Sequence, residues 1–363
     1  MELKLDLTKE YAIVLEGGGA KGSYEIGAWK ALEEAGVRFS AVAGSSGGAL
    51  NGALMVMGDL NEAVQLWENV TFSQIFEADD AQLKNLYDHK LSKLDLKSLV
   101  QDFAEIIREG GLDMEPLREL MAKYLDEEKI RNSGKKLYLV TYSLTDKREM
   151  DLDADEIEPG KLHDMLLASA YLPLFRREKL DGKSYVDGSV QNVLPINCLL
   201  ERGYRDIIVM RIYGVGIEKK TKIPGDAHII TVAPTEKLGG ILQFDAEQVK
   251  KDMRLGYFDC KRVLYGLAGE KYYIDRQWNE MQAYHALLVF VREMFRKKEP
   301  TVREINEKLL PKLAKKLKKK DANYSDILIA FLEKNAEELG ISPFEIRTEE
   351  NLVREICEKS GRM

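Results

Sequence analysis

The 363-residue chain has only four histidines and three cysteines, and it lacks any long apolar run. The cysteines, Cys198, Cys260 and Cys357, are odd in number and far apart. They therefore form neither a disulfide framework nor a C-x-x-C metal or redox motif. The longest apolar runs, such as residues 286–291, are far shorter than the roughly 20 residues that cross a bilayer.

Other absences narrow the class of protein further. Residues 1–10 alternate charged and apolar side chains and lack the apolar core of a secretory signal. We therefore expect a cytoplasmic protein in a reducing compartment. Lys and Arg number 54 against 61 Asp and Glu, and this net charge of −7 disfavours a nucleic-acid-binding surface. With 45% hydrophobic residues the chain is long enough to bury a core, which excludes disordered and disulfide-stapled classes.

Short apolar runs alternate with helical stretches from the start of the chain. Residues 11–15 form an apolar run closed by a glycine cluster, residues 23–35 have helical spacing, and residues 39–43 form a second run. This order predicts an α/β protein with a mostly parallel central sheet. Further predicted strands are residues 137–142, 184–186, 207–212 and 228–232.

Two long segments are predicted to be helical. Residues 60–131 form an insertion between the second and third strands, and it serves either as a lid or as scaffold. The chain from about residue 250 onward is predicted to be almost wholly helical. We therefore expect one domain at residues 1–268 and a helical C-terminal region at residues 269–363.

A first glycine loop, residues 17–22 (Gly-Gly-Gly-Ala-Lys-Gly), lies between a strand and a helix. It satisfies G-x-G-x-x-G, so a dinucleotide-binding oxidoreductase is one hypothesis. That fingerprint also requires an acidic residue at the end of the second strand, where this chain has Val42-Ala43-Gly44. A P-loop is disfavoured because Lys21 precedes Gly22 rather than following it.

The same loop also suits an anion. Consecutive glycines allow backbone N–H groups to converge at the positive end of the following helix, and an oxyanion is an anion. The alternative is a tight turn that needs glycine only for its backbone conformation.

A second glycine loop, residues 44–48, follows the second strand and fits G-x-S-x-G. In a nucleophile elbow, a sharp turn exposes the serine hydroxyl, and small flanking residues relieve the crowding. The motif places the nucleophile at Ser46, with Gly44 and Gly48 as the flanking glycines. Alone, this motif also occurs in ordinary flexible turns, but here it is the second of two glycine loops that each follow a strand.

An activated serine needs a base. Of the four histidines, His228 at the start of a strand is the best candidate, which leaves a Ser–His–Asp triad open. The other candidate is a carboxylate, since residues 184–186 form a short strand followed by Asp187-Gly188. Asp181-Gly182 is instead predicted to be the hairpin turn before that strand.

These motifs in this order resemble the patatin-like phospholipase family. Supporting blocks are residues 168–173 (Ala-Ser-Ala-Tyr-Leu-Pro) and 190–195 (Val-Gln-Asn-Val-Leu-Pro). The resemblance spans about residues 11–200 and continues more loosely to 264. Lys21 stands where the family often has arginine, and Ser189 where glycine or alanine is usual. The second departure affects rate or substrate fit more than chemistry.

The resemblance implies a three-layer α/β/α fold and a lipid acyl hydrolase with a Ser–Asp dyad. Ser46 would be the nucleophile and Asp187 the base, without any metal or organic cofactor. A competing hypothesis is a catalytically weak relative that binds lipid or scaffolds a membrane. The residues that the resemblance assigns to the oxyanion loop are Gly17, Gly18, Gly19, Lys21 and Gly22.

A lipid substrate calls for contact with a membrane, and residues 296–320 are the candidate segment. They contain 11 Lys/Arg and 3 Glu, and Pro311 is predicted to split them into two helices. A basic amphipathic segment either lies on an anionic bilayer or packs its apolar side on the protein body. The apolar positions at helical spacing are Val302, Ile305, Leu309, Leu313 and Leu317.

Overall fold

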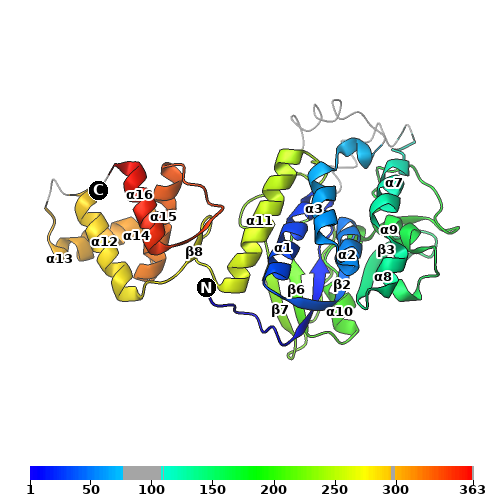
Figure 1. Cartoon of the computed structure of the whole chain (residues 1–363), viewed down its shortest axis with the longest axis horizontal. Coiled ribbons are helices and arrows are strands. Elements are labelled where there is room, and N and C mark those ends of the chain that lie inside the picture. The colour runs from blue at the N-terminus through cyan, green and yellow to red at the C-terminus, as the bar shows by residue number, and fades with distance from the viewer. Residues whose placement is uncertain (77–107, 109, 296–298, 362–363) are drawn as a thin grey trace. The chain divides into compact units, whose positions relative to one another are not determined.

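The computed structural model describes residues 1–76, 108, 110–295 and 299–361 (Figure 1). It forms two compact units. Leu5–Leu264 make up the larger one, here called the sheet unit. Met1–Lys4 and Tyr265–Met363 make up the C-terminal unit. The predicted division at residue 268 stays a prediction of domain organisation, because contacts within one chain do not test independent folding.

Within the described residues the sheet unit contains a seven-stranded sheet. Neighbouring strands run parallel except at β3, which pairs antiparallel with both β4 and β5. The mostly parallel sheet predicted from the sequence is confirmed, with strand bounds that differ by at most two residues. In spatial order the strands are β4 (Arg148–Asp153), β3 (Lys136–Ser143), β2 (Arg38–Ser45), β1 (Glu10–Leu15), β6 (Asp206–Met210) and β7 (His228–Val232), with β5 (Tyr185–Asp187) beside β3.

Helices cover both faces of this sheet (Figure 1). On one face, Ala12 and Val14 of β1 pack in a buried cluster with Cys198 and Leu199 of α10. On the other face, α2 lies so close that Gly52 adjoins Leu137, Val42 and Leu15. The three-layer α/β/α fold is therefore confirmed. Helices up to residue 265 include α1 (Ser23–Glu34), α2 (Gly47–Met57), α3 (Leu60–Asn69), α7 (Glu115–Tyr124), α8 (Glu127–Asn132), α9 (Leu162–Ser169), α10 (Ile196–Glu201) and α11 (Ala246–Tyr265).

The structure adds one strand to those predicted from the sequence and describes part of the predicted helical insertion. The edge strand β4 was not predicted, because its Arg-Glu-Met-Asp-Leu-Asp sequence lacks the apolar run of a buried strand. The predicted helical insertion at residues 60–131 includes α3, α7 and α8, joined to the sheet on either side. Its residues 77–107 and 109 lie outside the described residues.

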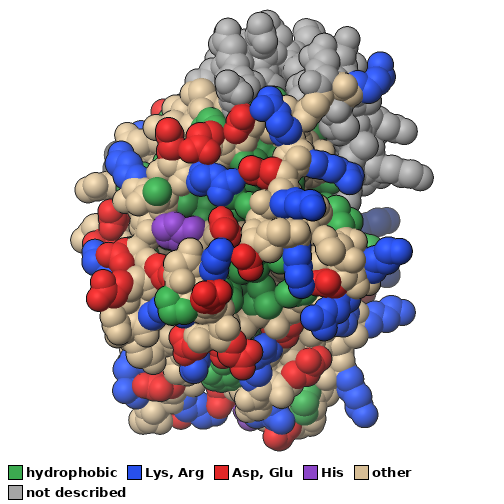
Figure 2. Space-filling model, turned by 90° about the vertical axis from the view of Figure 1, so that its right-hand side faces the viewer, with side chains coloured by type: hydrophobic (Ala, Val, Ile, Leu, Met, Phe, Trp, Pro, Cys, Tyr) green, Lys and Arg blue, Asp and Glu red, His purple; other side chains and the backbone are tan. Residues whose placement is uncertain are grey.

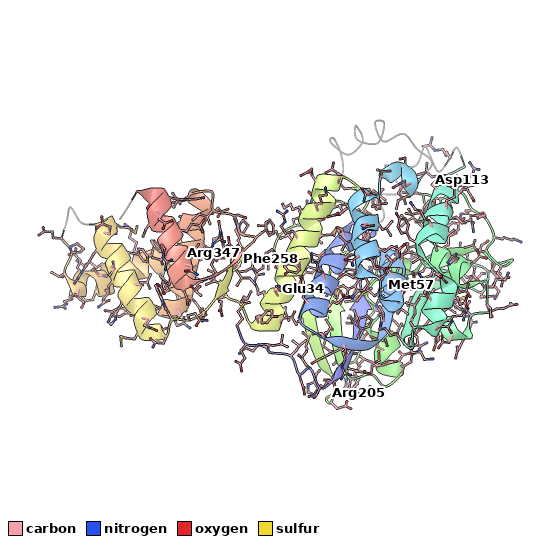
Figure 3. All side chains as sticks on the ribbon, viewed as in Figure 1. Glu34, Met57, Asp113, Arg205, Phe258 and Arg347 are labelled. Carbon is pink, nitrogen blue, oxygen red and sulfur yellow. The ribbon has the colours of Figure 1, made fainter. Side chains whose placement is uncertain are left out.

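The C-terminal unit is mainly helical, as predicted, around its own buried cluster. The structure adds a small parallel sheet, β8 with β9, whose three-residue strands are too short to predict from periodicity. Arg347 of β9, which is labelled in Figure 3, is buried and pairs with Glu345 and Glu355. The elements are β8 (Tyr273–Asp275), α12 (Glu280–Met294), α13 (Val302–Glu304), a π-helical turn (Ile305–Leu309), α14 (Leu310–Lys316), α15 (Tyr324–Glu338), β9 (Ile346–Thr348) and α16 (Glu349–Ser360).

In the described part of the basic segment, residues 299–320, four of the five predicted apolar positions pack on the buried cluster of the C-terminal unit, whereas Val302 is exposed. Ile305 is fully buried, and Leu309, Leu313 and Leu317 pack against the same cluster. Pro311 does not separate two helices, because it lies in the first turn of α14, where proline is tolerated, directly after the π-helical turn. Membrane contact through residues 296–320 stays a prediction. The exposed lysines of this segment would have to make that contact.

The face of the sheet unit in Figure 2 carries acidic and basic side chains side by side, with hydrophobic ones between them. No helix in the described ranges is both long and apolar enough to cross a membrane.

Candidate active site

Ser46 lies at a sharp turn between β2 and α2. Its backbone has φ +55° and ψ −130°, a conformation that costs energy for any residue with a side chain. The two flanking positions require glycine, because neighbouring backbone atoms approach them closely. A Cβ at Gly44 would lie 2.3 Å from the Gly48 carbonyl oxygen, and one at Gly48 would lie 2.7 Å from the Leu15 carbonyl oxygen. The G-x-S-x-G pattern thus forms an elbow at the carboxyl edge of the parallel strands.

Asp187 lies beside this elbow, at the end of β5. The Ser46 hydroxyl donates a hydrogen bond of 2.5 Å to Asp187 Oδ2, and both side chains are buried. The other oxygen, Oδ1, accepts the Ser189 amide at 2.8 Å. Burial raises the pKa of Asp187 above its ordinary value, and the hydrogen bonds from Ser46 and Ser189 partly offset this rise. The two residues predicted as nucleophile and base are therefore in direct contact.

The structure disfavours the His228 alternative. His228 opens β7 at the amino edge of the sheet, where it pairs with Asp206, whereas Ser46 follows the carboxyl end of β2. Parallel strands place these two edges at opposite ends. His163 contacts the Leu125 carbonyl oxygen at 3.0 Å, and His89 lies outside the described residues.

The first glycine loop contributes fewer amides to the site than the sequence suggests. The Gly17 amide donates to the Val193 carbonyl at 2.9 Å, and the Lys21 amide donates to the Gly18 carbonyl at 3.3 Å. The amides of Gly18 and Gly19 have no partner within the described part of the chain. A Cβ at Gly47 would lie 3.4 Å from the Gly19 nitrogen, so this amide borders the elbow.

Lys21 and Gly22 have packing roles in this loop. Lys21 Nζ donates to the Tyr213 carbonyl at 2.6 Å, which directs its charge to a neighbouring loop. The Gly22 carbonyl accepts from Asn51 at 3.0 Å, and a Cβ there would meet Asn51 and the Trp67 ring. The oxyanion role predicted for five residues is thus best supported at Gly18 and Gly19.

Glu16 is a functional candidate that sequence reasoning missed. Its buried carboxylate directly precedes the glycine loop and accepts the amides of Ile212 at 2.7 Å, Tyr213 at 3.0 Å and Gly214 at 3.3 Å. It therefore fixes that segment against the glycine loop. An acidic residue at the end of a buried strand was the available signal.

A second buried carboxyl group, that of Glu25 on α1, is linked to the first glycine loop through Asn51. Asn51 donates both to Glu25 Oε2 at 2.8 Å and to Gly22, and Trp67 donates to Asn51 at 2.9 Å. Glu25 Oε1 has no hydrogen-bond partner among the described residues. Burial raises the pKa of Glu25 well above its ordinary value, because it disfavours the charged form.

Glu25→Gln is expected to stabilise the protein increasingly as pH rises. Because the pKa of Glu25 is higher in the folded state, the contribution of this group to stability is fully present below its unfolded-state pKa. That contribution is lost as pH rises towards the folded value, by about 1.4 kcal/mol per unit of pKa difference. Glutamine stays neutral throughout. Urea unfolding from pH 4 to 8 measures this, with Glu33→Gln at an exposed site of the same helix as the control. Parallel pH curves for wild type and E25Q would contradict the assignment.

An apolar cavity of about 100 Å³ opens at Ser46. Its walls come from α2, α3, α7 and the segments around residues 172 and 242, so the described parts of the helical insertion contribute to it. A smaller cavity of about 30 Å³ touches both Ser46 and Asp187. Apolar side chains that line the larger cavity include Leu50, Leu54, Leu66, Trp67, Phe76, Leu117, Met121, Phe175, Leu242 and Phe244.

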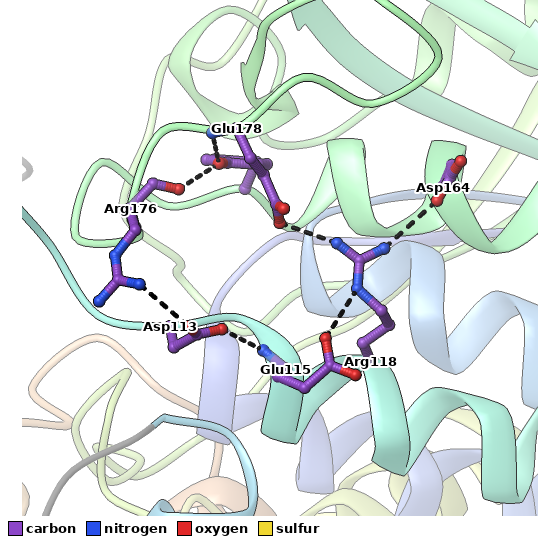
Figure 4. A network of polar contacts seen from close by, with 7 residues as sticks. Asp113, Glu115, Arg118, Asp164, Arg176 and Glu178 are labelled. Carbon is purple, nitrogen blue, oxygen red and sulfur yellow. Dashed lines mark hydrogen bonds and ion pairs between the residues drawn. The ribbon is translucent and has the colours of Figure 1, made fainter.

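Ion pairs hold one wall of this cavity in place (Figure 4). Arg118 of α7 pairs with Glu178 at 2.8 Å and with Asp164 of α9 at 3.4 Å. Arg176 pairs with Asp113 at 3.2 Å on the same side. These contacts fasten α7 to the segment that follows α9, and both line the cavity.

Comparison with known proteins identifies the family of this chain. A family model described as patatin-like phospholipase matches residues 13–200, more than half of the chain. The chain therefore belongs to the patatin-like phospholipase family, a family of lipid hydrolases, which confirms the predicted family and enzyme class. The matched range contains both glycine loops and Asp187.

Individual relatives are more distant. Lysophospholipase nte1 of Aspergillus terreus is 50% identical over 46 residues, which are 13% of this chain and 3% of that protein. The chain thus spans only a small part of that relative. VipD of Legionella pneumophila is 14% identical over 97% of this chain and 87% of that one, with a TM-score of 0.45. ExoU of Pseudomonas aeruginosa, in complex with SpcU, is 13% identical. The match covers 96% of this chain and 67% of that chain, with a TM-score of 0.35.

Proposed function

We propose that this chain hydrolyses carboxylic ester bonds of phospholipids or related acyl lipids, with Ser46 as the nucleophile and Asp187 as the base. The hydrogen bond of 2.5 Å from the Ser46 hydroxyl to Asp187, at the mouth of an apolar cavity, is the observation that carries this proposal. The larger cavity would hold the acyl chain, because its lining is almost wholly apolar.

In the first half-reaction Asp187 accepts the Ser46 proton as Oγ attacks the ester carbonyl carbon. In this proposal the amides of Gly18 and Gly19 donate to the oxyanion that forms. The C–O bond of the ester then breaks, the alcohol leaves with the proton from Asp187, and an acyl-Ser46 ester remains. Water attacks this ester, giving its proton to Asp187. Release of the fatty acid returns that proton to Ser46.

The smaller cavity suits the groups that exchange protons with Asp187. It borders Asp187 as well as Ser46, and its volume of about 30 Å³ has room for about two water molecules. The attacking water would therefore reach Asp187 through this cavity, which adjoins the larger one at Ser46.

A series of p-nitrophenyl esters from acetate to palmitate tests the substrate assignment. Long-chain esters should have the higher kcat/KM, because each buried CH₂ contributes about 0.8 kcal/mol. Met121→Trp should fill the cavity and lower kcat/KM for palmitate at least about tenfold relative to acetate. The ratio within one variant is independent of the amount of folded protein. An unchanged ratio in M121W would contradict an acyl chain in this cavity.

Activity is expected to fall on the acid side with the pKa of Asp187. The base works only when ionised, and burial raises its pKa above the ordinary aspartate value. The profile of log kcat/KM against pH should therefore show an acid limb above about pH 4. Full activity retained at pH 4 would contradict Asp187 as the base.

A further inference from the structure

One short segment, residues 169–171, holds both members of the Ser46–Asp187 pair through their backbone amides. The Ser46 amide donates to Ser169 Oγ at 3.0 Å, and the Asp187 amide donates to the Tyr171 carbonyl at 2.8 Å. Ser169 is the last residue of α9, and Tyr171 follows two residues later. The distance between nucleophile and base thus depends on this segment as well as on the strands that carry them.

The Ser169 hydroxyl bridges the elbow to β3 with one accepted and one donated hydrogen bond. It accepts from the Ser46 amide and donates to the Val140 carbonyl of β3 at 2.7 Å. Ser169 is completely buried, so water does not replace these partners. Loss of the hydroxyl would take this partner away from both the Ser46 amide and the Val140 carbonyl.

The elbow is sensitive to that loss because its backbone is strained. Ser46 has φ +55° and precedes the first turn of α2, so its amide is not part of the helical hydrogen-bond ladder. An unpaired buried amide is costly, and the chain would avoid this cost by relaxing the turn. Such a shift moves Oγ relative to Asp187, and a displacement of about 1 Å costs roughly 100-fold in rate.

We propose that Ser169 is a positioning residue for the reaction, which fixes the Ser46 elbow by bridging its amide to the Val140 carbonyl. The inference rests on the proposed role of Ser46 as nucleophile. Ser169 does not touch the substrate or the reacting atoms, so its removal should lower the rate of the covalent step and leave binding unchanged.

Covalent labelling with a fluorophosphonate measures the covalent step and binding separately, as the labelling rate constant kinact and the inhibitor constant KI. For Ser169→Ala we expect kinact to fall about 10- to 100-fold, with KI unchanged within about twofold. Ser143→Ala is the matched control, because Ser143 is equally buried in β3 and also makes one donated and one accepted hydrogen bond, both to Asp146. It should lower the thermal midpoint comparably and leave kinact and KI within twofold of the wild type.

Several outcomes would overturn the inference. A folded S169A with wild-type kinact would do so, and so would a loss of kinact in S143A as large as in S169A. If S169A does not fold, Ser169→Cys decides, because a thiol of similar size hydrogen-bonds more weakly and should give an intermediate kinact. A folded S169C with wild-type kinact would overturn the role of Ser169. Labelling of the wild type at a serine other than Ser46 would instead overturn the proposed function.

Discussion

Ser46→Ala is expected to abolish ester hydrolysis, and Asp187→Asn to lower kcat/KM by about 10²–10⁴-fold. Alanine removes the atom that forms the acyl-enzyme, and asparagine cannot accept the proton at the position where Ser46 Oγ donates at 2.5 Å. Both variants should retain the fold, since neither change adds volume. Release of p-nitrophenol from a long-chain ester measures the loss.

Asp181→Asn is the matched control for Asp187→Asn. Asp181 also precedes a glycine, but it lies exposed in the hairpin turn between Leu180 and Lys183. Its φ of +49° is one that asparagine tolerates well. D181N should keep wild-type activity. More than a tenth of the wild-type activity in D187N, or an equal loss in D181N, would argue against the dyad.

Gly19→Ala is expected to lower kcat by about 10²–10³-fold, the effect of losing an oxyanion donor. Gly19 has φ +56°, and a Cβ there would lie 2.1 Å from the Ile241 carbonyl oxygen, so the loop must shift. That shift moves the Gly18 and Gly19 amides away from the carbonyl oxygen of the substrate. The change should affect kcat more than KM, because the oxyanion exists only in the transition state.

Gly36→Ala separates this effect from backbone strain alone. Gly36 also has a positive φ, +74°, but a Cβ there would meet nothing within 4 Å. G36A should cost about 1 kcal/mol of stability and leave kcat unchanged. A wild-type kcat in G19A would contradict an oxyanion role for this loop.

The sequence was most informative where one structural requirement admits only one residue type. The elbow shows this, because backbone atoms lie where a Cβ at Gly44 or Gly48 would be. The parallel strands were also predictable, since burial on both faces gives continuous apolar runs. Edge strand β4 was not, because its mostly charged sequence carries no such run.

Tertiary contacts explain what the sequence left undetermined at the site. Glu16, Glu25 and Ser169 are polar residues whose roles depend on partners far along the chain, as in the bond from Ser46 to Ser169 across 123 positions. The sequence also does not show which glycine amides are free to bind an oxyanion. The Gly17 amide is not, because it donates to the carbonyl of Val193, which lies outside the loop. The spacing of residues along the sequence does not predict such partners.

Mass-spectrometric mapping of the residue labelled by a fluorophosphonate tests the central claim most directly. Wild type, Ser46→Ala and Asp187→Asn would be treated side by side, with folding checked by circular dichroism. We expect a single adduct on the wild-type peptide that contains Ser46, absent from S46A and strongly reduced in D187N. An adduct on any other serine, or undiminished labelling of S46A, would contradict it.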